Sequence, residues 1–60
     1  MDIVQKRLLI CWDDSWEDYG IKDFKNLKKD ELYYSSEKYD LFCEKVTNKE
    51  VYLRAYWKDK

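Results

Sequence analysis

Hydrophobic residues occupy every second position at both ends of the chain. In residues 50–57 they alternate with charged and tyrosine side chains, and residues 3–12 show a similar alternation that Lys6 interrupts. Successive side chains of a strand point to opposite faces of its sheet, so a period of two predicts a strand with one hydrophobic face. We therefore predict a first strand over residues 3–12 and a last strand over residues 50–57.

Turn-forming residues separate the first strand from a weaker second one. Asp13, Asp14 and Ser15 have side chains that can bond nearby backbone groups, which predicts a turn. Alternation resumes less clearly over residues 16–24, and Gly20 inside that stretch predicts a bulge or kink. Because the link between these two strands is so short, we expect them to form an antiparallel hairpin.

A helical spacing of hydrophobic and small residues dominates residues 30–47. At about 100° per residue, one face of a helix over this range collects seven residues: Leu32, Ser35, Ser36, Tyr39, Phe42, Cys43 and Val46. We predict that this face packs on the sheet and that Asp30 caps the helix, because its carboxylate can accept from free backbone amides. A helix that begins only at Ser35 or Ser36, after an extended segment, is the alternative.

These elements predict an α+β fold in the order β-β-α-β. It consists of a three-stranded antiparallel sheet with one helix packed on it, which is close to the smallest arrangement that is stable by itself. The 60 residues correspond to a single domain, residues 1–60. A chain of this size buries only about 60% of the surface that its unfolded form exposes. We therefore expect one thin core and no deep cleft.

Charge and cysteine content narrow the possible functions. The chain has 12 basic and 13 acidic side chains, with an acidic excess in residues 1–20 and 30–50 and a basic excess in residues 21–29. It has no histidine, and Cys11 and Cys43 lie too far apart in sequence for the close ligand spacings of a zinc site. We expect no metal and two small buried thiols, while the sequence leaves a disulfide between them open.

The distribution of hydrophobic residues also indicates where in the cell the protein is expected. No stretch approaches the roughly 20 apolar residues of a membrane-spanning helix, and charges near the start interrupt the apolar core of any signal peptide. We expect a cytoplasmic protein without a membrane partner.

The residues give little support to catalysis or to nucleic-acid binding. Four carboxylates crowd the first turn and the start of the next strand: Asp13, Asp14, Glu17 and Asp18. Acid–base chemistry would need them in a shared cleft, whereas a hairpin tip exposes them to water. Gly20 is the only glycine, so there is no glycine-rich phosphate loop. The basic strip within residues 22–29 is short. We expect no enzymatic activity, no cofactor and no direct contact with nucleic acid.

Aromatic content favours a protein-binding surface instead. Three Trp and six Tyr exceed what a thin core can hide, and both residue types are favoured at interfaces. The side of the predicted helix that faces away from the sheet carries Tyr34, Lys38, Leu41 and Lys45. An aromatic side chain ringed by charges is typical of a binding hot spot, so we expect Tyr34 to be its centre. The acidic loop is a second candidate contact, suited to a basic groove, and its residues are Asp14, Trp16 and Glu17.

The chain also resembles a known family. The resemblance rests on Lys29-Asp30-Glu31-Leu32 followed by Tyr34, Ser35, Ser36 and Tyr39, and on the opening Met1-Asp2-Ile3-Val4 and the apolar strand that ends at Trp12. This order is similar to the Dmd family, small antitoxins of T-even phages that neutralise bacterial toxin endoribonucleases of the RnlA and LsoA type. The family carries Trp at the position of Tyr34, and cysteines at those of Tyr52 and Tyr56.

The resemblance implies an α+β fold and direct blockade of the toxin's active-site groove, without a cofactor. From it we expect a small phage-encoded antitoxin that binds a bacterial defence toxin in the cytoplasm of the infected cell, with Tyr34 at the centre of the contact. Two alternatives fit the same residues. One is an anti-CRISPR-type or other anti-defence inhibitor, and the other is a self-associating structural or accessory module whose surplus aromatic side chains close a homodimer.

Overall fold

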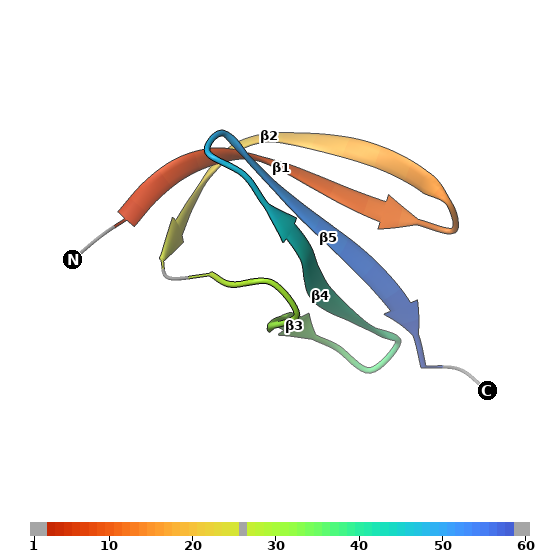
Figure 1. The fold of residues 1–60 in the computed structure, drawn as a ribbon. Helices are drawn as coiled ribbons and strands as arrows, with labels where there is room; N and C mark the ends of the chain where they lie inside the picture. Colours follow the sequence, from red (N-terminus) through yellow and green to blue (C-terminus); the bar gives the residue numbers. More distant parts are fainter. Residues whose placement is uncertain (1–2, 26, 59–60) are drawn as a thin grey trace.

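The computed structural model describes residues 3–25 and 27–58, and within them five strands form one curled sheet (Figure 1). The strands are β1 (Ile3–Trp12), β2 (Ser15–Lys25), β3 (Leu32–Ser35), β4 (Tyr39–Val46) and β5 (Glu50–Trp57). Their order across the sheet is β2-β1-β5-β4-β3. The chain therefore consists of a hairpin, β1–β2, and a meander, β3–β4–β5, joined where β5 pairs with β1.

The predicted first hairpin is confirmed. β1 and β5 have the predicted limits, β2 extends one residue further than predicted at each end, and β1 pairs antiparallel with β2. Only Asp13 and Asp14 separate the paired residues Trp12 and Ser15. Both have positive φ, 49° and 72°. This backbone twist is that of the two-residue turns that fit the right-handed twist of a hairpin, and Asp tolerates it better than most residues.

The predicted bulge at Gly20 is also confirmed. Arg7 faces Ile21 while Leu9 faces Asp18, so one residue of β1 stands opposite two residues of β2. Gly20 has a φ of 80°, and its backbone N–H donates to the Asp18 carboxylate over 2.8 Å. This hydrogen bond is the largest of the effects that lower the pKa of Asp18, followed by the favourable charge of Arg7.

We expect Gly20→Ala to destabilise the protein by about 1 kcal/mol or more, because a φ of 80° strains any residue with a Cβ. The added methyl would meet nothing within 4 Å, so backbone strain is the whole effect. The midpoint of urea denaturation measures it. Lys22→Ala, an exposed position of the same strand, is the control and should change stability by less than about 0.5 kcal/mol. Equal midpoints for the two variants would contradict the assigned backbone geometry.

The predicted helix over residues 30–47 is wrong. The range forms β3, a turn and β4, and the described residues contain no helix. Asp30 does not cap a helix; it lies in a turn with a φ of 68°, and its backbone N–H donates to the Cys43 carbonyl. Ser36, predicted to lie on the helix face that packs on the sheet, also has a different role. Ser36 accepts from the backbone N–H groups of Lys38 and Tyr39 and thereby closes the β3–β4 turn.

The predicted fold class is wrong for the same reason. The described chain is all-β, with a five-stranded mixed sheet in place of an α+β arrangement of three antiparallel strands and a helix. β5 pairs parallel with β1 on one side and antiparallel with β4 on the other.

The core lies on one face of the sheet, which we call the core face. Its buried residues come from four strands: Leu8, Ile10, Phe24, Leu41, Cys43, Val51 and Leu53. The sheet curls so that its outermost strands approach at one end, where the rings of Phe24 and Tyr33 lie 5.9 Å apart, and Leu27 packs against this core from the connecting segment. Leu32, predicted to be a core residue of the helix, is 50% exposed. We call the opposite, convex surface the open face.

Candidate functional site

Aromatic rings gather on the core face, at the end of the sheet where β1 and β5 finish and β4 begins. The Trp12 ring lies 5.1 Å from Tyr39 and 5.8 Å from Trp57, and the Tyr39 and Trp57 rings are 5.6 Å apart. Tyr34 extends the group from β3, with its ring 6.1 Å from Tyr39. Ring pairs at these distances with tilted or edge-to-face geometry are mutually attractive. We call these four residues the aromatic cluster.

The register of the strands explains why the cluster forms. Tyr39 is paired with Trp57 across β4 and β5, and Tyr34 is paired with Leu41 across β3 and β4. Since β1 runs parallel to β5, the end of β1 brings Trp12 to the same edge of the sheet. Residues from three separate parts of the chain thus meet through strand pairing.

The acidic tip of the β1–β2 hairpin is attached to this cluster. The indole N–H of Trp57 donates to the Asp13 carboxylate over 2.9 Å. The indole N–H of Trp12 donates to the Tyr19 hydroxyl, which in turn donates to Glu17 over 3.1 Å. Both indole groups of the cluster therefore reach carboxylates, one directly and one through a tyrosine. The arrangement fixes acidic groups at the border of an aromatic surface.

Much of the cluster remains accessible. Trp57 is 51% exposed and Tyr34 50% exposed, whereas Trp12 and Tyr39 are half-buried against the core. The cluster consists of rings that pack directly on one another. It is an aromatic surface over which another molecule can lie.

The structure brings together some of the predicted contact residues and separates others. Tyr34 belongs to the cluster, on a strand rather than on a helix, and Glu17 reaches it through Tyr19. Asp14 lies exposed beside Asp13 at the tip. Lys38 lies exposed in the β3–β4 turn, where its carbonyl accepts from the backbone N–H of Lys58.

Leu41, Lys45 and Trp16 lie elsewhere. Leu41 is only 6% exposed and belongs to the core, so the predicted outer stripe of a helix does not exist. Lys45 and Trp16 both contact Tyr52 on the open face, where the Lys45 ammonium lies 5.8 Å from the Tyr52 ring and Trp16 packs edge-on against it.

The open face carries its own row of interacting side chains. The Arg54 guanidinium lies 5.7 Å from the Trp16 ring and makes two hydrogen bonds to the Glu44 carboxylate, the longer of them 3.2 Å. These bonds are the main reason that the pKa of Glu44 lies below its usual value. Trp16 and Arg54 meet above the buried Cys11, their shared pairing partner across the strands. The row covers the Cys11 thiol, so we interpret the side chains of this row as part of the packing of the sheet.

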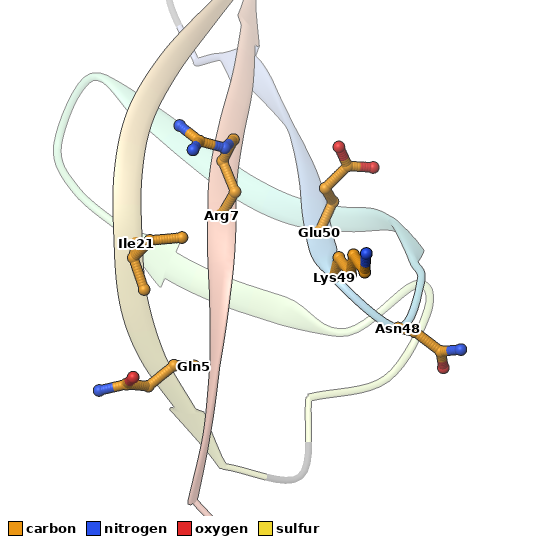
Figure 2. Close-up of a pocket in the computed structure, with 6 residues that line it drawn as sticks. All are labelled: Gln5, Arg7, Ile21, Asn48, Lys49 and Glu50. Carbon is orange, nitrogen blue, oxygen red and sulfur yellow. The ribbon is translucent and has the colours of Figure 1, made fainter.

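A shallow hollow of about 320 Å³ lies between the first hairpin and the β4–β5 turn (Figure 2). Its walls are Gln5, Arg7, Ile21, Asn48, Lys49 and Glu50. The Arg7 guanidinium is paired with Asp18 at 2.9 Å, and the Glu50 carboxylate accepts from the Tyr52 hydroxyl. Asn48 points outward from the turn in Figure 2. Two charged groups of this hollow, on Arg7 and Glu50, therefore already have partners within the protein.

The part of the chain that the structure describes contains potential metal ligands and both cysteines. No group of three or more potential metal-ligating side chains occurs in residues 3–25 and 27–58. Cys11 and Cys43 are free thiols, and both are buried like small hydrophobic residues of the interior. Burial raises the pKa of the Cys43 thiol. The segments that the structure describes include no helix long and apolar enough to cross a membrane.

Sequence reasoning missed Trp12, Tyr39 and Trp57 as site residues. A signal was present in residues 39–43, where Tyr39, Leu41 and Cys43 alternate with Asp40 and Phe42. Read with a period of two, this stretch is a strand whose hydrophobic face includes Tyr39, so the sequence could have shown that Tyr39 lies on a strand but not that it pairs with Trp57.

Comparisons of the chain with protein-family models, with curated protein sequences and with solved structures found no match.

Proposed function

We propose that the protein acts by binding another protein through the aromatic cluster and the acidic hairpin tip beside it. The observation that carries this proposal is the exposure of Trp57 and Tyr34 at a cluster whose indole groups are fixed to carboxylates. Tyr and Trp dominate the energetics of protein interfaces, where their apolar bodies lose water and their polar edges keep hydrogen bonds. A border of carboxylates suits a partner with a basic surface.

We further propose that this binding is inhibitory. A basic groove is what an endoribonuclease offers to its substrate, and an acidic protein seated there would exclude RNA by occupying the same space. The target class that the family resemblance implies, a bacterial toxin endoribonuclease, meets this condition. An anti-CRISPR-type blocker of another nucleic-acid channel would act in the same way on a different protein.

The test begins with capture of the partner from bacterial lysate on the immobilised full chain, and identification of the retained protein by mass spectrometry. The purified partner is then titrated with the protein in an RNA-cleavage assay. We expect cleavage to stop at a fixed stoichiometry and the two chains to migrate as one complex. Undiminished cleavage in a saturated complex would contradict the inhibitory mechanism. A protein that retains no partner and instead gains mass with concentration is a self-associating module, contrary to the proposal.

Neutralising the acidic tip should slow association with the partner. Asp14→Asn combined with Glu17→Gln removes two negative charges at the border of the cluster, and we expect the association rate constant to fall by roughly threefold to tenfold at low salt. Stopped-flow fluorescence at two ionic strengths measures this. The matched control is Asp23→Asn, a carboxylate at the far end of β2 that accepts from Gln5. Because the control removes one charge and the double variant two, a fall in the control half as large on a logarithmic scale would show that net charge alone matters. An unchanged rate in the double variant would exclude the tip from the encounter.

A further inference from the structure

A second hollow of about 320 Å³ opens on the open face, between β4, β5 and the segment that precedes β3. The residues that line it are Asp30, Phe42 and Tyr56. The Phe42 and Tyr56 rings lie 5.5 Å apart at an angle of 74°, so one ring presents its edge to the face of the other. Tyr56 is 51% exposed, which leaves much of its ring accessible. The hollow thus combines aromatic surface with a carboxylate.

A similar combination of an aromatic ring and a carboxylate contacts an arginine side chain of the protein itself. Two residues before Tyr56 on β5, and on the same face, the Arg54 guanidinium lies 5.7 Å from the Trp16 ring and forms two hydrogen bonds with Glu44. Phe42 is paired with Arg54 across the two strands, so the two environments are neighbours on one face. A planar guanidinium can stack on a ring and bond a carboxylate with two parallel N–H groups at the same time, which an ammonium does less well.

We propose that the hollow lined by Asp30, Phe42 and Tyr56 is a binding site for an arginine side chain presented by a partner protein. The guanidinium would lie against the Tyr56 ring and donate to the Asp30 carboxylate, as Arg54 does with Trp16 and Glu44. This site faces away from the aromatic cluster and does not depend on the function proposed above.

Lys29 is the internal competitor for the carboxylate of this site. Its ammonium lies 3.4 Å from Asp30, and both side chains are largely exposed, at 69% and 80%. Exposed pairs of this kind contribute little to stability and are easily exchanged. An incoming guanidinium can therefore displace Lys29, and removal of the lysine should help binding.

The experiment titrates the full chain with N-acetylarginine amide and follows the ring signals of Phe42 and Tyr56 and the backbone signal of Asp30 by NMR. We expect saturable shifts at these residues. The citrulline counterpart has the same length without the charge and should bind at least tenfold more weakly; the lysine counterpart should also bind more weakly.

Variants locate the site independently. Tyr56→Ala should weaken binding at least tenfold and Asp30→Asn at least fivefold, and Asn suits the positive φ of this position. Lys29→Gln should bind as tightly as the parent or more tightly. Tyr33→Ala, an exposed tyrosine on another segment, is the matched control and should bind like the parent. Equal binding of the citrulline or lysine derivative, shifts at other residues, or binding that survives Tyr56→Ala would each overturn the proposal.

Discussion

Replacing Leu53 by alanine is expected to destabilise the protein by about 2–5 kcal/mol. Leu53 has 0% exposure, and it pairs with Ile10 on one side and Cys43 on the other, at the centre of the sheet. Truncation removes its hydrophobic contribution and leaves a cavity that the paired strands cannot close. A chain of 60 residues has a total stability of only about 3–9 kcal/mol at common values per residue. Leu53→Ala should therefore bring the protein close to unfolding at room temperature.

The same substitution at Leu32 is the matched control. A helix over residues 30–47 would place Leu32 in the core, whereas β3 leaves this side chain 50% exposed. We expect Leu32→Ala to cost about 1 kcal/mol or less. Thermal unfolding followed by circular dichroism measures both variants. A larger loss at Leu32 than at Leu53 would contradict the all-β fold.

Replacing Tyr34 by alanine is expected to weaken binding of the partner by at least about 2 kcal/mol, or roughly 30-fold in Kd. Tyr34 is half exposed at the border of the aromatic cluster, and its ring packs on Tyr39. A bound partner would bury the exposed half of the Tyr34 ring. Alanine would remove this contact between the partner and the ring. Isothermal titration calorimetry with the purified partner measures the difference.

The neighbouring residue on β3 provides the control for this substitution. Tyr33 is 42% exposed but lies toward Phe24, at the other end of the sheet from Trp57. Tyr33→Ala should change the Kd by less than about threefold, and both variants should retain the thermal melting of a folded protein. Equal losses for the two tyrosines, or an unchanged Kd for Tyr34→Ala, would remove the aromatic cluster from the interface.

The strands of the first hairpin and β5 could be predicted because alternation and turn chemistry agree there. β5 keeps a period of two without interruption, and Asp13 and Asp14 form a turn that their residue type favours. The bulge could be predicted at Gly20 because glycine is the residue type that adopts a positive φ without strain.

The helix prediction failed because a bulge in one strand and the turn before that strand imitate a helical period. A bulge in β4 inserts one residue between Cys43 and Lys45, so that Cys43 and Val46 both reach the core face although they are three positions apart. A turn separates Ser36 from Tyr39 by the same spacing. Three-residue steps are a property of helices in regular structure, but here they arise from a bulge and a turn.

The candidate site was partly predictable. The acidic tip was identified from its run of charged residues, whereas Tyr34 was placed at the surface by a helix that does not exist and is exposed because β3 leaves its ring half uncovered. The rest of the cluster depends on the pairing of β1 with β5 and of β5 with β4, which joins residues 40 or more positions apart in the case of Trp12 and Trp57. Such long-range register has no signature in any short window of sequence.

The three tryptophans allow the most direct test of the proposed interface. Trp12 and Trp57 belong to the aromatic cluster, whereas Trp16 lies on the open face beside Tyr52. Their indole N–H groups give separate signals in a ¹⁵N–¹H spectrum, which can be recorded before and after addition of the purified partner. We predict that the Trp12 and Trp57 signals shift or broaden while the Trp16 signal keeps its position. A change at Trp16 with Trp12 and Trp57 unmoved would place the interface on the other face and contradict the account.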